Sequence, residues 1–189
     1  MNYLGHLYIT RNHPQLTFGN FIGDFIKGKK VELLSGVDEK GVRLHRSIDF
    51  FTDQHDLTKQ VKRFFSPEFG LLSSVLVDMY FDHVLAKNWK DFSNISLQDF
   101  SQTQFNILDT RVTEMPEMCA YMYEYFKNDN WLMRYQTLSG TLQSLKGMTR
   151  RFNLKYDLET SEAIFIENET VITERFYAFI SDIDKSLDR

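Results

Sequence analysis

The sequence LLSSVLVDMYFDHVLAKNW, residues 71–89, decides the expected fold. At about 100° of rotation per residue, a helix formed here is apolar nearly all round, because Val77, Phe81 and Val84 fill the side that the other apolar residues leave open. A helix of this kind is expected at the centre of a protein. It nevertheless carries two carboxylates and one imidazole in its middle, namely Asp78, Asp82 and His83.

The two carboxylates share one stripe of this helix, about 40° apart, and His83 lies about 100° further round among apolar residues. A buried carboxylate without a partner is costly, and two of them one turn apart also repel each other. A shared cation would relieve both penalties. The alternative is that Asp78 and Asp82 pair with buried arginines, for which the candidates are Arg43, Arg46 and Arg134.

The rest of the chain also favours helices. Its 189 residues include 17 Phe and 9 Tyr but only 3 Pro and 9 Gly, so large side chains recur at helical spacing with few breaks. We therefore predict an all-α, multi-helix bundle in a single compact domain, residues 1–189, with a seam near 88–96 between an N-terminal part and a C-terminal helical lobe. The expected helices span 19–28, 38–54, 67–88, 97–110, 116–127, 131–151 with an interruption near Gly140, and 158–186. Gly28 is expected to cap the first of these, and Ser66 to cap the third ahead of Pro67.

Charge and composition narrow the function classes. A net charge of −4 does not support nucleic-acid binding, which usually requires an excess of basic residues. The single cysteine, Cys119, excludes an intramolecular disulfide and suits a reducing compartment. The chain opens without a leader-like segment, and no apolar run approaches the roughly 20 residues that cross a bilayer. We therefore expect a cytoplasmic protein without a nucleic-acid or membrane partner.

A second group of polar residues lies in GVRLHRSIDFFTDQH, residues 41–55. His45 and Asp49 are one helical turn apart and can reach the same ion. Asp53 and Asp56 continue the polar side and are better explained as a solvated face. We predict that His45 and Asp49, together with the two carboxylates of the central helix, hold a metal ion.

Two further stretches add polar side chains in apolar surroundings. MNYLGHL places His6 one turn after Asn2, and GNFIGDFIKG places Asp24 one turn after Asn20. Helices that each offer a His or an Asp in this way are typical of a bundle around an internal metal site. Mixed imidazole and carboxylate ligands favour Mn²⁺, Fe²⁺ or Mg²⁺ over a structural zinc.

Four blocks, MNYLGHL, GNFIGDFIKG, LHRSIDFFTD and DMYFDHVLAKNW, resemble in order and spacing the acyl carrier protein phosphodiesterases, also called holo-acyl carrier protein hydrolases. The resemblance implies a divergent, HD-domain-like metal phosphohydrolase, although the adjacent pair here is Asp82-His83, the reverse of the usual order. It also implies hydrolytic removal of 4′-phosphopantetheine from holo-acyl carrier protein, aided by Mn²⁺. The acidic carrier protein would then be the partner.

These considerations give each candidate residue an expected role. His45, Asp49, Asp78 and Asp82 are the expected metal ligands. Further ligands or proton donors to the departing serine oxygen are His6, Asp24 and His83. Arg46 and Lys27 are expected to hold phosphate oxygens, and Lys27, Lys29 and Lys30 to dock the carrier protein. The alternatives are a phosphohydrolase acting on a nucleotide or another small phosphodiester, and a non-catalytic helical binding domain.

Overall fold

The computed structural model describes residues 1–34, 36–151 and 156–187. Within these ranges the regular elements are α-helices and short 3₁₀ helices without a strand, which confirms the all-α prediction. The α-helices are α1 (Tyr3–Ile9), α2 (Thr17–Phe21), α3 (Gly36–Gln54), α4 (Asp56–Phe69), α5 (Leu72–Lys87), α6 (Leu97–Asp109), α7 (Glu117–Asn128), α8 (Trp131–Arg134), α9 (Leu138–Arg151) and α10 (Leu158–Leu187). The 3₁₀ helices are η1 (Pro14–Leu16), η2 (Gly23–Phe25), η3 (Gly28–Leu33), η4 (Trp89–Asp91) and η5 (Val112–Glu114). No helix in the described ranges is long and apolar enough to cross a membrane.

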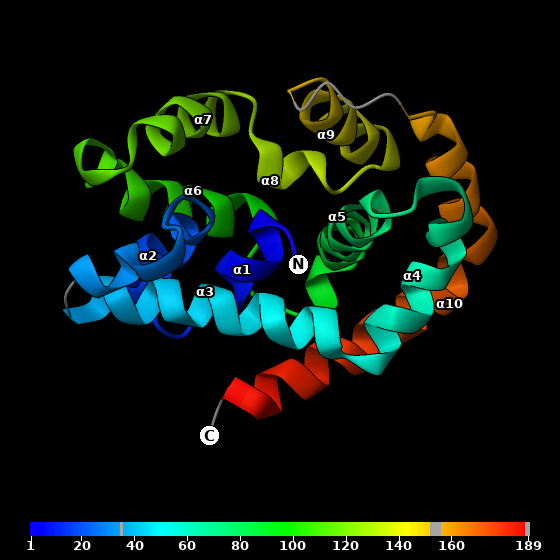
Figure 1. The fold of residues 1–189 in the computed structure, drawn as a ribbon, viewed down its shortest axis with the longest axis horizontal. Helices are drawn as coiled ribbons and strands as arrows, with labels where there is room; N and C mark the ends of the chain where they lie inside the picture. Colours follow the sequence, from blue (N-terminus) through cyan, green and yellow to red (C-terminus); the bar gives the residue numbers. More distant parts are fainter. Residues whose placement is uncertain (35, 152–155, 188–189) are drawn as a thin grey trace.

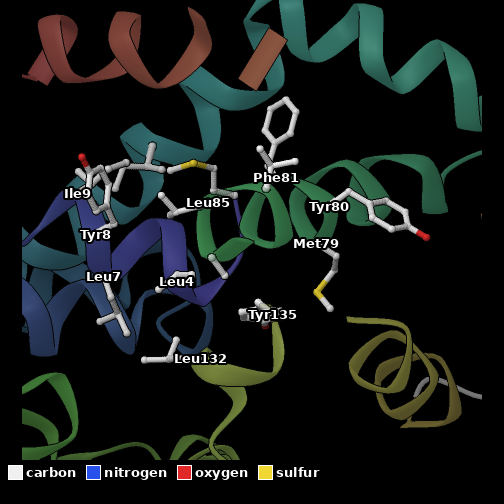
Figure 2. Packing of buried hydrophobic residues seen from close by; sticks show 14 of the residues in the cluster. Leu4, Leu7, Tyr8, Ile9, Met79, Tyr80, Phe81, Leu85, Leu132 and Tyr135 are labelled. Atoms are coloured by element: carbon white, nitrogen blue, oxygen red, sulfur yellow. The ribbon is translucent and has the colours of Figure 1, made fainter. Parts of the chain in front are cut away.

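Helix α5 lies at the centre of the molecule, as its sequence predicts. It packs against α1, α4, α9 and α10, and Figure 1 shows it between these helices. Tyr80 of α5 stacks between Phe65 of α4 and Phe165 of α10, with ring centroids 5.3 Å and 4.6 Å away. On another side, Leu85 joins Leu4 of α1 in the buried cluster that Figure 2 shows. The apolar circumference of α5 is therefore covered by helices from both halves of the chain.

Helices α2 and α3 pack backbone to backbone through two glycines. A Cβ atom added at Gly19 would lie 2.4 Å from the carbonyl oxygen of Asp38, and one added at Gly41 would lie 2.7 Å from the Cα of Gly19. Side chains at these positions would push the helices apart. The close approach places the middle of α2 directly beside the first two turns of α3.

The prediction of one helix over residues 19–28 is wrong. Helix α2 ends at Phe21, η2 follows as a separate turn, and Gly28 adopts a φ of 57° at the start of η3 instead of capping a helix. Glycine within a helix is unfavourable, which weakens this stretch as a continuous helix. Gly23 also meets the ring of His45, because an added Cβ would lie 2.3 Å from its Cγ.

The predicted start of the central helix is also wrong. Ser66 and Pro67 lie in the last turns of α4, and the chain turns at Gly70, where φ is 49°. Glycine adopts a positive φ at little cost, so Gly70 marks the boundary before α5. Four other expected helices match α3, α6, α7 and α10 to within two residues. The helix expected over 131–151 is divided into α8 and α9, and the break lies between Arg134 and Leu138, just before Gly140.

Candidate metal centre and cleft

Three side chains from two helices meet in one cluster, His6 of α1 and His45 and Asp49 of α3. One potential ligand atom from each lies within 4.8 Å of the others. Asp49 Oδ1 is 3.0 Å from His6 Nε2, and Asp49 Oδ2 is 3.1 Å from His45 Nε2. The imidazole rings stack with their centroids 4.1 Å apart. Each histidine side chain is 6% exposed and that of Asp49 is 43% exposed, so the carboxylate joins two buried rings to solvent.

Asn20 of α2 orients both rings. Its Nδ2 donates to the carbonyl oxygen of His6 at 2.7 Å, which leaves its Oδ1 3.2 Å from His6 Nδ1. Its backbone carbonyl oxygen is 2.8 Å from His45 Nδ1. Both oxygens can only accept hydrogen bonds, so Nδ1 of each histidine carries the hydrogen and Nε2 of each ring faces Asp49. No role was predicted for Asn20 from the sequence, although a lone amide between the aromatic residues of TFGNF is a usable signal.

Asp24 brings a second carboxylate to His45. Its Oδ1 lies 3.2 Å from His45 Nε2. Burial lowers the pKa of His45, but the hydrogen bonds to Asp24 and Asp49 outweigh burial and raise the pKa to about 9. Burial lowers the pKa of His6, and Asp49 offsets only part of that effect. Burial alone would raise the pKa of Asp49, yet the two histidines hold it well below its usual range.

These contacts require a positive charge at Nε2 of His45. With hydrogen on Nδ1, a neutral His45 would direct its Nε2 lone pair at two carboxylate oxygens, and lone pairs repel each other. A proton on Nε2 relieves the repulsion, and so does a metal ion shared by the same atoms. An octahedral ion with ligands at about 2.1 Å separates neighbouring ligand atoms by about 3.0 Å. The separations of 3.0 and 3.1 Å join His6 to Oδ1 and His45 to Oδ2 of Asp49, and they lie in the range of hydrogen bonds as well as of neighbouring metal ligands.

The cluster lines a cleft of about 1180 Å³. Helices α1, α2, α3 and α5 form one side, and α7, α8 and α9 form the other, which lies across the molecule from α3 in Figure 1. Lys27 is the only lysine or arginine among the described residues that line it. The lining carboxylates are Asp24, Asp49, Asp53, Asp78, Glu117 and Asp129. An anionic substrate would meet strong repulsion here without a bound cation.

The two carboxylates of α5 have other partners. Asp82 is fully buried and accepts hydrogen bonds from the backbone N–H groups of Asn2, Leu4 and Gly5, at 3.2, 2.7 and 3.1 Å. The Asp82 carboxylate therefore lies at the N-terminus of α1, where a negative charge is favourable. Burial raises the pKa of Asp82 to about 7, although these N–H groups favour the anion. Asp78 lies at the cleft, 3.0 Å from the amino nitrogen of Met1.

The structure thus brings together His45 and Asp49 from the expected ligand set, with His6 as the third member. Asp78 and Asp82 do not belong to the group of three, and their role as ligands stays a prediction. Among the described residues, neither carboxylate pairs with Arg43, Arg46 or Arg134, and their polar partners there belong to the start of the chain.

The remaining candidates lie at and away from the cleft. His83 is buried and does not line the cleft, and its Nδ1 donates to the carbonyl oxygen of Tyr135 at 2.7 Å. Arg46 donates through Nη2 to the carbonyl oxygens of Ile26 and Gly28, at 2.6 and 3.0 Å. Arg46 therefore holds the segment that carries the three lysines. All three are exposed, and they are Lys27 at the cleft and Lys29 and Lys30 beside it in η3.

The sequence is similar to proteins of one known family. The profile of the family described as acyl carrier protein phosphodiesterase matches residues 1–183. A protein of that name from Photorhabdus laumondii is 31% identical over 152 residues, which cover 80% of this chain and 77% of the relative. One from Yersinia pestis is 28% identical, with 80% and 79% covered. One from Shigella boydii is 26% identical over 180 residues, with 95% and 93% covered. No solved structure matches the chain.

Proposed function

Because the chain belongs to the acyl carrier protein phosphodiesterase family, whose name denotes hydrolysis of phosphodiesters, we propose the reaction that it catalyses. The protein hydrolyses the bond between 4′-phosphopantetheine and a serine of holo-acyl carrier protein and so yields the apo form. Water adds to phosphorus, the bond from phosphorus to the serine oxygen breaks, and a proton reaches that oxygen. The reaction depends on a divalent metal ion.

The contacts of His45 carry the metal part of this proposal. Its Nδ1 is committed to the carbonyl oxygen of Asn20, and its Nε2 faces Asp24 and Asp49 at 3.2 and 3.1 Å. We assign His6, His45 and Asp49 as ligands. His45 lowers the pKa of Asp24 against the effect of burial, and an anionic Asp24 suits a further ligand better than a proton donor.

The donor set supports Mn²⁺, with Mg²⁺ and Fe²⁺ as alternatives, because imidazole and carboxylate are combined without a thiolate. Such an ion, when bound, neutralises phosphate charge and makes water more acidic. Asn20 contributes by fixing the direction of both imidazoles before the ion arrives. The buried rings and the half-exposed Asp49 direct ligand atoms to the solvent side, where the substrate enters.

Lys27 and the adjacent lysines support the substrate part. Lys27 supplies the positive side chain at the cleft and can contact a phosphate oxygen of the substrate. Lys29 and Lys30 lie outside the cleft and can attract an acidic carrier protein. Arg46 acts through the backbone of this segment, since its guanidinium holds Ile26 and Gly28.

Intact-mass measurement of holo-acyl carrier protein tests the proposal. Incubation with the protein and Mn²⁺ should convert the carrier to its apo mass and release 4′-phosphopantetheine, and chelation should stop the conversion. Asp49→Asn should abolish it while the variant stays folded, because the amide keeps the side-chain size and removes the charge. Hydrolysis of bis(4-nitrophenyl) phosphate without any action on the carrier would favour a small-diester hydrolase. No hydrolysis and no Mn²⁺ binding would favour a non-catalytic domain.

A further inference from the structure

The side of the cleft opposite the metal cluster has a different chemical character. Three helices of the C-terminal half line it with large apolar side chains, which we call the methionine wall: Met118, Met122 and Tyr125 of α7, Trp131 of α8 and Met148 of α9. Met118 and Tyr125 are each 54% exposed. Large apolar side chains left open to water inside a cleft are typical of a ligand-binding surface.

The size of the cleft exceeds what the reacting phosphate needs. Its volume of about 1180 Å³ is that of a site for a whole small molecule, for which pockets of about 300–1,000 Å³ are usual. A metal ion and a phosphodiester at the cluster would leave the space toward α7 and α9 open. Unbranched, polarizable methionine side chains can adapt to a flexible ligand that fills this space.

We propose that the methionine wall binds the pantetheine arm of the substrate. This inference rests on the proposed function, which supplies an arm attached to the reacting phosphate. The arm is uncharged at neutral pH and carries methyl and methylene groups along its length, so it suits an apolar surface. The phosphate then lies at the cluster, the carrier protein at Lys29 and Lys30, and the arm across the cleft against α7–α9.

Charge favours the arm over the carrier protein as the occupant of this wall. Glu117 and Asp129 line the cleft on the same side, and Glu124 is exposed on α7. An acidic protein would be repelled by these carboxylates, whereas a neutral chain would not. The methionine wall and the lysines Lys29 and Lys30 thus bind different parts of one substrate.

A double substitution, Met118→Gln with Met148→Gln, tests the wall. Both side chains line the cleft without being fully buried, so the variant should fold. We expect the KM for holo-acyl carrier protein to rise about tenfold with kcat nearly unchanged, because ground-state and transition-state binding of the arm are lost together. Inhibition by free pantetheine, which has no phosphate, should weaken by a similar factor. Mn²⁺ affinity should not change, because neither side chain belongs to the metal cluster.

Ile166→Gln is the matched control, because Ile166 is 58% exposed on α10 and does not line the cleft. It should leave all three measurements as in the wild type. If the double variant unfolds, Met118→Gln alone, at a half-exposed position, gives the same comparison.

Two results would overturn the inference while the proposed function stands. One is a double variant whose KM for the carrier and whose inhibition constant for pantetheine both equal those of the wild type. The other is a higher KM for the carrier with unchanged inhibition by pantetheine, which would assign the wall to the carrier protein itself. A wild-type protein that does not hydrolyse holo-acyl carrier protein would instead refute the proposed function.

Discussion

His45 shows how a single residue can prepare a site for a cation. The carbonyl oxygen of Asn20 fixes its ring so that only Nε2 remains to face the cleft, and two carboxylates lie within 3.2 Å of that atom. Without a metal ion the same arrangement holds a proton, which is why the pKa of His45 rises to about 9. Proton and metal therefore compete for one position.

This competition predicts the pH dependence of Mn²⁺ binding. Below about pH 9 the proton on His45 must leave when the ion binds, so the apparent Kd should rise about tenfold for each unit that the pH falls. Burial lowers the pKa of His6, so we expect fewer protons to be released from His6 than from His45 near neutral pH, even though its Nε2 also faces a carboxylate oxygen of Asp49. Calorimetry in buffers of different ionisation enthalpy should detect release of about one proton per ion near pH 7.5.

Asp24→Asn is the control for that measurement. It removes one of the two carboxylates that raise the pKa of His45, so the pH at which proton competition begins should fall. A Kd that stays constant between about pH 6.5 and 8.5 in the wild type would show that His45 is not a ligand.

The sequence could reveal some of these residues and not others. His45 and Asp49 are predictable as a pair because a helical turn places them side by side, whatever the tertiary fold. His6 comes from another helix, and no spacing links it to Asp49. Asp82 gave the same signal of a carboxylate in an apolar helix whether it held a metal ion or the end of α1. Only the packing of α1 against α5 shows that Asp82 contacts the end of α1.

At the scale of elements, glycines decide how closely the helices approach the site. Gly23 of η2 lies against His45, and a Cβ there would be 2.3 Å from Cγ of the ring. Gly147 of α9 also lines the cleft, but a Cβ there would meet nothing within 4 Å. The two positions make a matched pair.

Gly23→Ala should weaken Mn²⁺ binding by at least about tenfold, because the ring of His45 must move away from Asp24 and Asp49. Gly147→Ala should leave Mn²⁺ affinity unchanged and raise the free energy of unfolding by about 0.5–1 kcal/mol, since alanine favours a helix interior. Calorimetric titration and urea denaturation measure the two effects. Equal Mn²⁺ affinities in both variants would contradict this account of Gly23.

Asp82 joins two elements, and its removal should act on stability first. Asp82→Asn keeps the shape but turns an amide toward N–H groups of α1, so we expect a loss of about 1–3 kcal/mol in the free energy of unfolding without metal. Urea denaturation of the metal-free protein measures it, with the exposed Asp56→Asn as control. A loss of Mn²⁺ affinity at unchanged metal-free stability would instead show that Asp82 is a ligand.

The boundaries of elements were harder to predict than their existence. The central helix follows from apolar residues on every side, which only burial can accommodate. The first residue of this helix cannot be predicted in the same way, because the sequence Ser66-Pro67 is by itself a suitable start for a helix. The conformation of Gly70 sets the boundary, and a sequence alone does not specify which glycine takes a positive φ.

At the scale of the whole molecule, opposite charges are separated in space. The described lining of the cleft is acidic apart from Lys27, the amino group of Met1 and the two histidines, while the exposed lysines of η3 follow Lys27 in the sequence. A net charge of −4 conceals this arrangement, which the sequence indicated only as the cluster KGKK. The cleft itself was not predictable, because its two sides come from opposite halves of the chain. The assignment of all 189 residues to one domain stays a prediction.

This separation gives a prediction for the carrier protein. Replacing Lys29 and Lys30 with Glu should raise the KM for holo-acyl carrier protein about tenfold or more at low salt with kcat nearly intact, because exposed charges govern encounter and ground-state binding. Lys27 stays unchanged because it lines the cleft. Added salt should also raise the wild-type KM, since the attraction between exposed charges more than about 10 Å apart is largely screened at ~0.1 M salt.

The control is Lys90→Glu with Lys185→Glu, which changes the net charge equally at exposed positions that do not line the cleft. If both double variants raise KM alike, overall charge and not the η3 lysines attracts the carrier. If neither does and the salt profile is flat, the carrier docks elsewhere. A rise confined to the η3 variant, absent with bis(4-nitrophenyl) phosphate, would place the carrier protein at η3, because a small diester reaches the metal cluster without contacting Lys29 or Lys30.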